Sequence, residues 1–167
     1  PRGTQTKGPA SLGTTASATL YPGKTVQFEQ VGGIWQLSDP DPMNYQLSAS
    51  GGGYQLASPV RGLIYTFDGS GKLASIADRT GNTHTVTQGV FGPVTVADGL
   101  GRTLTLTYSG ALLSAVKDQT GRTVTFAHAG TNLTSVTDAN GKTTTYGYTS
   151  SSQPSLLAST QRPAGNT

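Results

Sequence analysis

The sequence predicts an all-β protein built from tandem β-hairpins, and three observations lead to this prediction. Gly occurs 23 times and Pro 9 times in 167 residues, charged residues make up only 11%, and Thr and Ser are frequent. Such residues favour turns and strands over helices. A tetrapeptide Asp-x-x-Gly recurs every twenty residues, and a Thr-rich alternating run follows each copy. We therefore expect an extended, twisted antiparallel sheet that grows by one hairpin per repeat.

The turns carry the most regular part of the repeat, with Asp at positions 78, 98, 118 and 138. Asp at the first position of a turn can bond the backbone two residues later, and Gly at the fourth position accepts a positive φ. A related turn begins at residue 68. The predicted structural turn residues are Asp68, Gly71, Asp78, Gly81, Asp98, Gly101, Asp118, Gly121, Asp138 and Gly141.

The strands are predicted from alternation after each turn, as in Thr103-Leu104-Thr105-Leu106-Thr107-Tyr108. A period of two places one set of side chains on each face of a sheet. We expect one face to be apolar, with Leu106 and Phe126, and the other to be rich in Thr. That candidate binding face contains Thr83, Thr85, Thr103, Thr105, Thr107, Thr123, Thr125, Thr143 and Thr145.

The composition changes along the chain and predicts four parts. The first part is rich in Gly, Pro, Ser and Thr and reads as a flexible or extended arm. The second carries an aromatic-Gln-Leu motif at Trp35, Tyr45 and Tyr54. The last loses the pattern, as expected where a repeat array has been cut. The predicted parts are an arm at 1–20, an irregular β segment at 21–61, the hairpin repeats at 62–150 and a tail at 151–167.

The stretch from Gly62 to Asn82, GLIYTFDGSGKLASIADRTGN, resembles the YD-repeat or Rhs family. The stretches at 113–123 and 133–143 repeat the same pattern, and the resemblance covers residues 54–148. The resemblance implies a β-sheet that spirals into a hollow shell, as in bacterial polymorphic toxins, toxin-complex subunits and teneurins. In those proteins the shell encloses a toxic domain or forms an adhesive module. The Tyr-Asp pair of the repeat is represented here by Phe67-Asp68.

No catalytic or metal-binding pattern is recognisable. The sequence has no Cys, no Gly-x-Ser-x-Gly and no Gly-x-x-x-x-Gly-Lys-Ser/Thr phosphate loop. Five of the eight acidic residues are the turn aspartates, which we interpret as structural rather than as a calcium site. The Asp39-Pro40-Asp41-Pro42 segment is interpreted as a turn, and His84 and His128 as sheet residues on the apolar side. We predict no cofactor, no metal and no enzymatic activity.

The net charge of +3 comes from Lys and Arg that are spread singly, which argues against a nucleic-acid partner. No apolar run reaches the length of a membrane helix. The leading hypothesis is a non-catalytic segment of a secreted or surface-exposed bacterial shell that encapsulates or presents a toxin or other effector. Its partners would be the rest of the shell or a cargo domain, and its cut edges could self-associate.

Two alternatives come from other functional classes. One is a cell-surface adhesion or carbohydrate-binding module that binds a surface glycan through the Thr-rich face and the aromatic residues. The other is a self-cleaving or toxin-linked enzyme, which requires a catalytic domain that the sequence does not display.

Overall fold

The computed structural model describes residues 14–20, 23–149 and 154–163, in which fifteen strands and no helix occur. No helix in this part of the chain could therefore cross a membrane. The strands are β1 (Thr15–Leu20), β2 (Lys24–Val31), β3 (Ile34–Leu37), β4 (Gln46–Ser50), β5 (Gly53–Ser58), β6 (Leu63–Phe67), β7 (Leu73–Asp78), β8 (Thr83–Gln88), β9 (Pro93–Ala97), β10 (Thr103–Ser109), β11 (Leu112–Asp118), β12 (Thr123–Ala129), β13 (Asn132–Thr137), β14 (Thr143–Tyr148) and β15 (Leu157–Gln161).

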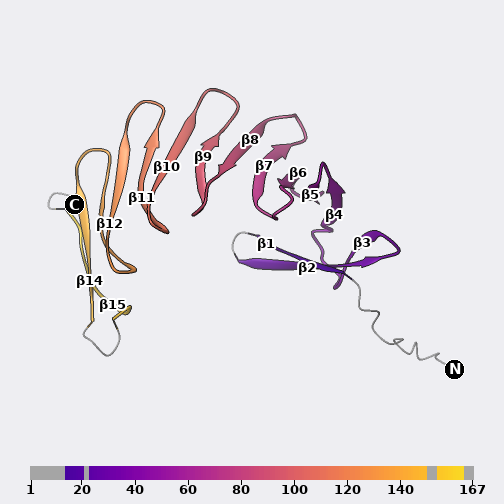
Figure 1. The fold of residues 1–167 in the computed structure, drawn as a ribbon, viewed down its shortest axis with the longest axis horizontal. Coiled ribbons are helices and arrows are strands. Elements are labelled where there is room, and N and C mark those ends of the chain that lie inside the picture. The colour runs from indigo at the N-terminus through magenta and orange to yellow at the C-terminus, as the bar shows by residue number, and fades with distance from the viewer. Residues whose placement is uncertain (1–13, 21–22, 150–153, 164–167) are drawn as a thin grey trace. The chain divides into compact units, whose positions relative to one another are not determined.

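The strands follow chain order within two sheets (Figure 1). The first sheet holds β1, β2 and β3, and the second runs from β4 to β15 in a linear, open order. Strands that pair are antiparallel, as β10 is with β9 and β11. The predicted all-β fold of tandem antiparallel hairpins is confirmed. Contacts divide the chain into two compact units, Pro1–Gly81 and Asn82–Thr167, and each is described by itself.

The buried core of the described residues lies in the first unit. Val26, Phe28, Tyr45 and Leu56 are each at most 4% exposed. Val26 and Phe28 alternate with exposed residues along β2, because successive strand side chains point to opposite faces. Half-buried residues from β1, β3, β4 and β6 pack around this cluster. The three-stranded sheet is thereby held against the strands that follow it.

The segment predicted as an arm contributes a strand to this unit. Its residues 15–20 form β1, which pairs antiparallel with β2, while residues 1–13 lie outside the described part. Thr15, Ser17 and Thr19 are exposed, whereas Ala16 and Ala18 are half-buried against the core. Hydroxyl residues and small apolar residues therefore alternate between the two faces of a strand here, although the amino-acid composition of this segment is typical of a loop.

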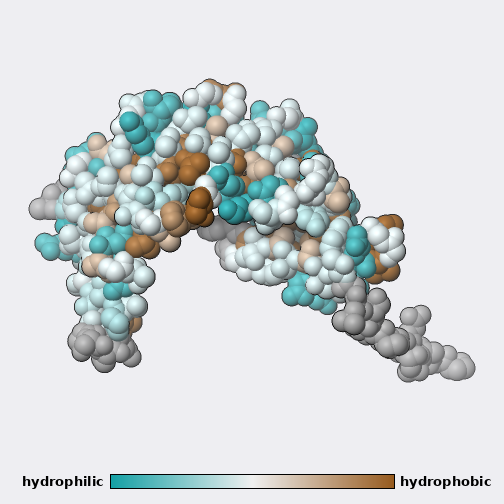
Figure 2. Space-filling model, in the orientation of Figure 1, coloured by the Kyte–Doolittle hydropathy of each residue, from teal (hydrophilic) through white to brown (hydrophobic). Residues whose placement is uncertain are grey.

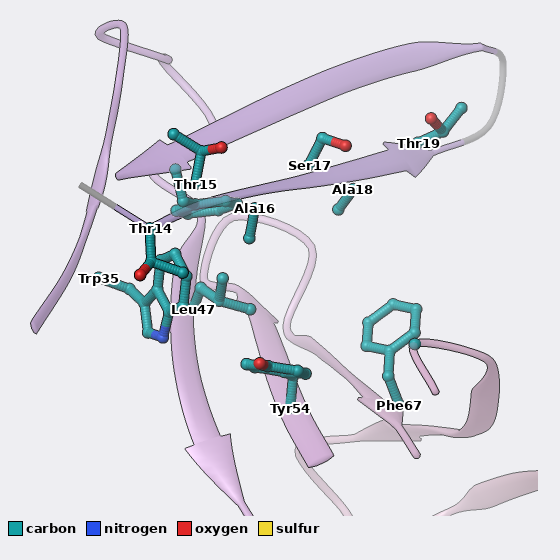
Figure 3. A pocket seen from close by; sticks show the side chains of 12 residues that line it. Thr14, Thr15, Ala16, Ser17, Ala18, Thr19, Trp35, Leu47, Tyr54 and Phe67 are labelled. Atoms are coloured by element: carbon teal, nitrogen blue, oxygen red, sulfur yellow. The ribbon is translucent and has the colours of Figure 1, made fainter. Parts of the chain in front are cut away.

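An open pocket lies beside the core, between β1 and the strands beneath it (Figure 3). Its volume is about 410 Å³. Ala16 and Ala18 point into the space from β1, and Leu47, Tyr54 and Phe67 bound it from the opposite side. Because the two alanines are short, the space between these elements is left unfilled.

The second unit is a run of hairpins whose apolar side chains are half-buried at most. None of its described residues is buried, and Leu104 is 44% exposed. Leu106 pairs with Val116, and Phe126 pairs with Val136, so apolar residues meet across neighbouring strands. Figure 2 shows apolar surface in the region of β9 and β10. Within the described residues, one face of these hairpins is thus apolar without a second layer over it.

The predicted tail also contains a strand. Residues 157–161 form β15, which pairs antiparallel with β14. All five of its residues are exposed, and none carries a charge. Within the described residues, β15 ends the sheet order.

Candidate functional site

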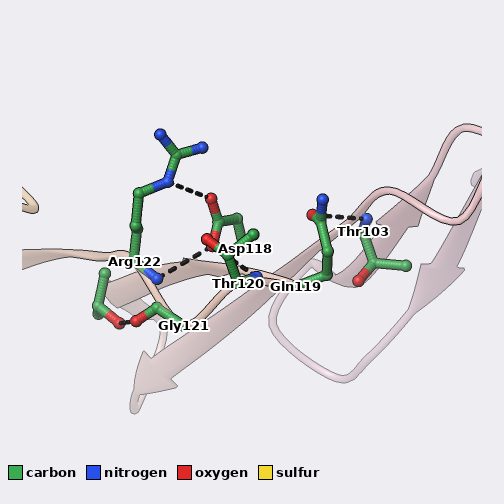
Figure 4. Close-up of polar contacts among 7 residues, drawn as sticks. Thr103, Asp118, Gln119, Thr120, Gly121 and Arg122 are labelled. Carbon is green, nitrogen blue, oxygen red and sulfur yellow. Dashed lines mark hydrogen bonds and ion pairs between the residues drawn. The ribbon is translucent and has the colours of Figure 1, made fainter.

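Each predicted turn aspartate closes its turn through side-chain hydrogen bonds. The Oδ1 atom of Asp118 accepts bonds from Thr120 N at 2.9 Å, Thr120 Oγ1 at 2.7 Å and Arg122 N at 3.0 Å (Figure 4). Asp68 is bonded in the same way by Ser70 and Lys72, and Asp138 by the backbone of Asn140 and Lys142. The aspartates therefore organise the backbone of the turns.

Arginine four residues later binds the second oxygen of two of these carboxylates. Arg122 Nε donates to Asp118 Oδ2 at 2.7 Å, and Arg102 Nε donates to Asp98 Oδ2. Both pairs are at the surface, where ion pairs contribute little to stability. At these two turns a basic side chain therefore contacts the carboxylate.

Hydrogen bonds to the ionised form lower the pKa of these carboxyl groups. The Thr120 hydroxyl, with help from Arg122, lowers the pKa of Asp118 to about 2 from the usual 3.8, against the opposing effect of desolvation. The hydroxyl of Ser70 is the largest cause that lowers the pKa of Asp68, and the backbone N–H of Leu100 is the largest for Asp98. These turns therefore favour the charged carboxylate.

The fourth position of each Asp-x-x-Gly turn adopts a positive φ. Gly101 has φ of +89° and Gly121 has φ of +95°. The N–H of Gly121 donates to the carbonyl of Asp118 at 3.1 Å. Positive φ is the conformation that Gly adopts without a steric cost. Gly71, Gly81 and Gly141 also have positive φ.

The turn aspartates do not assemble a metal site among the described residues, where no three His, Cys, Asp or Glu side chains cluster. Asp68 and Asp78 lie at opposite ends of β7, so Asp68 does not belong to the row of turns that contains Asp98, Asp118 and Asp138. His84 is exposed and His128 is half-buried. The carboxylate oxygens instead accept hydrogen bonds within their own turns.

Asp41, in the Asp-Pro segment, also binds within its own unit. Its Oδ1 accepts a bond from Met43 N at 2.8 Å, and its Oδ2 lies 2.5 Å from Lys24 Nζ. The hydrogen bond from Lys24 is the largest cause that lowers the pKa of Asp41. Lys24 Nζ also lies 5.6 Å from the ring centre of Tyr45. This carboxylate therefore anchors the segment against β2.

The Thr residues of the candidate face differ in exposure. Thr85, Thr105, Thr107, Thr125, Thr143 and Thr145 are exposed, and Thr83, Thr103 and Thr123 are half-buried.

The intervening strands add hydroxyls to the same face, which the sequence analysis did not foresee. Thr105 of β10 pairs with Thr95 of β9, which in turn pairs with Thr87 of β8. A second row crosses β12, β13 and β14 at Thr125, Thr137 and Thr143. Neighbouring strands lie about 4.8 Å apart. The Thr residues therefore form rows on adjacent strands rather than isolated positions on alternate ones.

Tyr108 and Tyr148 each follow a β-bulge. The pairing register shifts between Thr107 and Tyr108, and again between Gly147 and Tyr148. The hydroxyl of Tyr108 donates to the carbonyl of Pro93 at 3.0 Å, and that of Tyr148 donates to Leu133 at 2.8 Å. The register also shifts before Phe67, Gln88 and His128, so the bulge does not require an aromatic residue, and the alternation alone does not reveal it.

The three aromatic residues of the predicted Gln-Leu motif have different environments. Tyr45 is 4% exposed and belongs to the core, so it is not available to a ligand at the surface. Trp35 and Tyr54 both line the pocket beside β1, with ring centres 6.2 Å apart in an edge-to-face arrangement. The structure thus brings together two of the three aromatic side chains.

The recurrent turns, bulges and hairpins define the repeat geometrically, and a comparison with protein families matches its C-terminal part. Residues 128–167 match the family model described as RHS Repeat. The match confirms the Rhs resemblance over this stretch. The matched stretch includes β13, β14 and β15 and extends over residues 151–167, which the sequence analysis assigned to a tail. No curated protein matches the chain.

Proposed function

We propose that the chain is a non-catalytic wall segment of a secreted or surface-exposed bacterial shell made of RHS repeats, which encloses a toxin or other effector. The observation that carries this proposal is the second unit, where hairpins joined by Asp-x-x-Gly turns present one apolar face. A sheet with an apolar face requires a covering partner, because exposed apolar surface is costly in water. The rest of the shell and its cargo would supply that partner.

The turn chemistry supports a structural role. The carboxylates of Asp68, Asp98 and Asp118 accept hydrogen bonds from backbone N–H groups of their own turns. These bonds stabilise the turn conformation. A general acid or base needs a pKa near the operating pH, whereas these groups have lowered pKa values. The described acidic side chains therefore suit a wall better than a catalytic centre.

Protection from a protease, measured in the intact gene product, tests whether the shell encloses a cargo. A specific protease site would be placed in the proposed cargo and, as a matched control, between Val90 and Phe91, which are 87% and 56% exposed at the tip of the β8–β9 hairpin. We expect rapid cleavage at the hairpin and slow cleavage in the cargo until the shell is denatured. Equal cleavage rates at both sites in the native protein would contradict the enclosing role.

The Thr rows favour a second candidate, a module that binds an uncharged surface glycan. The rows at Thr95–Thr105 and Thr125–Thr137 present hydroxyls on adjacent strands, which can bond to sugar hydroxyls. A glycan array tests this candidate with Thr105→Val and Thr125→Val as matched variants. Binding by the wild-type chain that both substitutions weaken would support it, whereas no binding by the wild-type chain would leave the wall as the better function.

A further inference from the structure

The β1 strand has an unpaired edge among the described residues. It lies at the end of the three-stranded sheet, with β2 as its neighbour. Gln30 N of β2 donates to Thr14 O, and Ser38 N donates to Gln27 O of β2, both at 2.9 Å. Even-numbered residues of β2 thus bond toward β1 and odd-numbered residues bond toward β3, because backbone groups alternate in direction in antiparallel pairs.

The same alternation fixes the direction of the backbone groups of β1. Ala16 pairs with Phe28 and Ala18 pairs with Val26, both even-numbered residues of β2. The N–H and C=O groups of Thr15, Ser17 and Thr19 must therefore point to the outer edge. Such an edge is a template for another strand.

An apolar groove runs along this strand. Every residue from Thr14 to Thr19 borders it, so it follows β1 as far as Thr19 rather than meeting one face at one point. Its other walls include Trp35, Leu47, Tyr54 and Phe67 (Figure 3). None of the described residues that line it is charged. Backbone groups that are unpaired among the described residues and space for apolar side chains thus lie along the same strand, β1.

We propose that β1 docks an extended segment of a partner polypeptide by β-strand addition. The segment would pair antiparallel with β1 over about six residues, with its alternate apolar side chains in the groove. Main-chain bonds would give affinity, and the groove would select uncharged apolar side chains, as in other cases of strand addition. This inference is independent of the proposed wall function.

The register of such a pair makes a specific prediction. Partner residues bonded to Thr15, Ser17 and Thr19 share the face of those side chains, which point away from the groove. The residues between them lie opposite Ala16 and Ala18 and point into the groove. A peptide of alternating Thr and Val, with lysine added at each end for solubility, therefore binds through its Thr amides and places Val in the groove.

Binding of this synthetic peptide to the full chain tests the proposal. Trp35 is the single tryptophan of the chain and lines the groove, so its emission reports occupancy. We expect binding by the unmodified peptide and by a peptide N-methylated on its Val amides, which point away from β1. N-methylation of the Thr amides should weaken binding at least tenfold. Equal binding of the two methylated peptides, or no binding of the unmodified one, would overturn strand addition.

Variants of the chain test separately how the backbone edge of β1 and the groove contribute to peptide binding. Ser17→Pro removes an outward N–H and should reduce peptide affinity at least tenfold, while Pro is tolerated at such an edge position. Ala18→Leu should fill the groove and also reduce affinity. Ser17→Thr keeps the N–H and is the matched control. Thermal unfolding shows whether each variant is folded, and unchanged affinity in folded Ser17→Pro and Ala18→Leu would refute the proposal.

Discussion

The carboxylate of Asp118 contacts Arg122 through both oxygens, accepting the backbone N–H on Oδ1 at 3.0 Å and the guanidinium on Oδ2 at 2.7 Å. One side chain thus ties the end of β11 to the start of β12. Because the backbone bond fixes the turn while the Arg122 side chain is 75% exposed, the two contacts should differ in their importance for stability.

The turn carboxylates should make stability depend on pH in the acid range. The folded-state pKa of Asp118 is about 2, below the usual 3.8, so its contribution is present above pH 3.8 and is lost as pH falls toward 2. Urea unfolding of the wild type and of Asp118→Asn, measured between pH 7 and pH 2, checks this. The midpoints of the two proteins should converge as pH falls. Arg122→Gln is the control and should change the midpoint at pH 7 only slightly, whereas a constant gap across the range would contradict the assignment.

Glycine at the fourth turn position should be required only because the backbone there has a positive φ. Gly101 and Gly121 have φ near +90°, and no atom of the described residues lies within 4 Å of an added Cβ. Replacing either by Val should cost about 1–3 kcal/mol, because a β-branched residue is strained there. Thr125→Val, at an exposed strand position, is the control and should be nearly neutral. Urea unfolding gives the free energies, and unchanged stability in both glycine variants would rule out strain.

The two faces of the second unit should respond differently to charge. Leu106 and Phe126 are half-buried in apolar rows, so Leu106→Asp and Phe126→Asp should destabilise the unit by about 1–3 kcal/mol. Thr105→Asp and Thr125→Asp place the same charge on exposed positions and should be tolerated. Soluble yield and thermal unfolding distinguish the pairs. The opposite ranking would mean that the apolar face is not the protected one.

The turn at Asp98 lacks one bond that the turns at Asp78 and Asp118 have. Thr80 and Thr120 donate a side-chain hydroxyl to Asp78 and Asp118, whereas Leu100 occupies that position and is 75% exposed. Leu100→Thr should restore the bond and raise the melting temperature by about 1–4 °C.

A Leu100→Val variant provides the control for that substitution. It is β-branched like Thr but has no hydroxyl, so it should leave the melting temperature closer to that of the wild type. An equal rise in both variants would attribute the gain to side-chain shape rather than to the bond with the carboxylate.

The β15 strand should promote self-association through its edge. Its residues are exposed and uncharged, and it ends the sheet order of the described residues. Charged side chains discourage edge pairing, so Ser159→Lys with Gln161→Lys should reduce concentration-dependent light scattering. Thr125→Lys adds charge inside the sheet and should have less effect. A wild-type chain that stays monomeric at all concentrations would count against edge pairing.

The sequence was sufficient to predict the elements that depend on neighbouring residues. The Asp-x-x-Gly spacing identified the turns, because a carboxylate bonds the backbone two and four residues later and Gly permits the positive φ. Alternation identified Thr105 and Leu106 as residues of opposite faces. These features depend on contacts within one hairpin, which a linear pattern records directly.

Other features depend on which strands become neighbours. The sequence analysis described residues 1–20 as a flexible or extended arm and assigned no strand there; residues 15–20 form β1, since β2 offers a partner and the core accepts Ala16 and Ala18. It grouped Tyr45 with Trp35 and Tyr54, but core packing buries Tyr45 and leaves the other two beside a groove. The twenty-residue pattern by itself determined the hairpins and their turns. Only the tertiary structure decided which strand edge is unpaired among the described residues and which aromatic side chains lie beside it, because both depend on contacts between segments that no local pattern encodes.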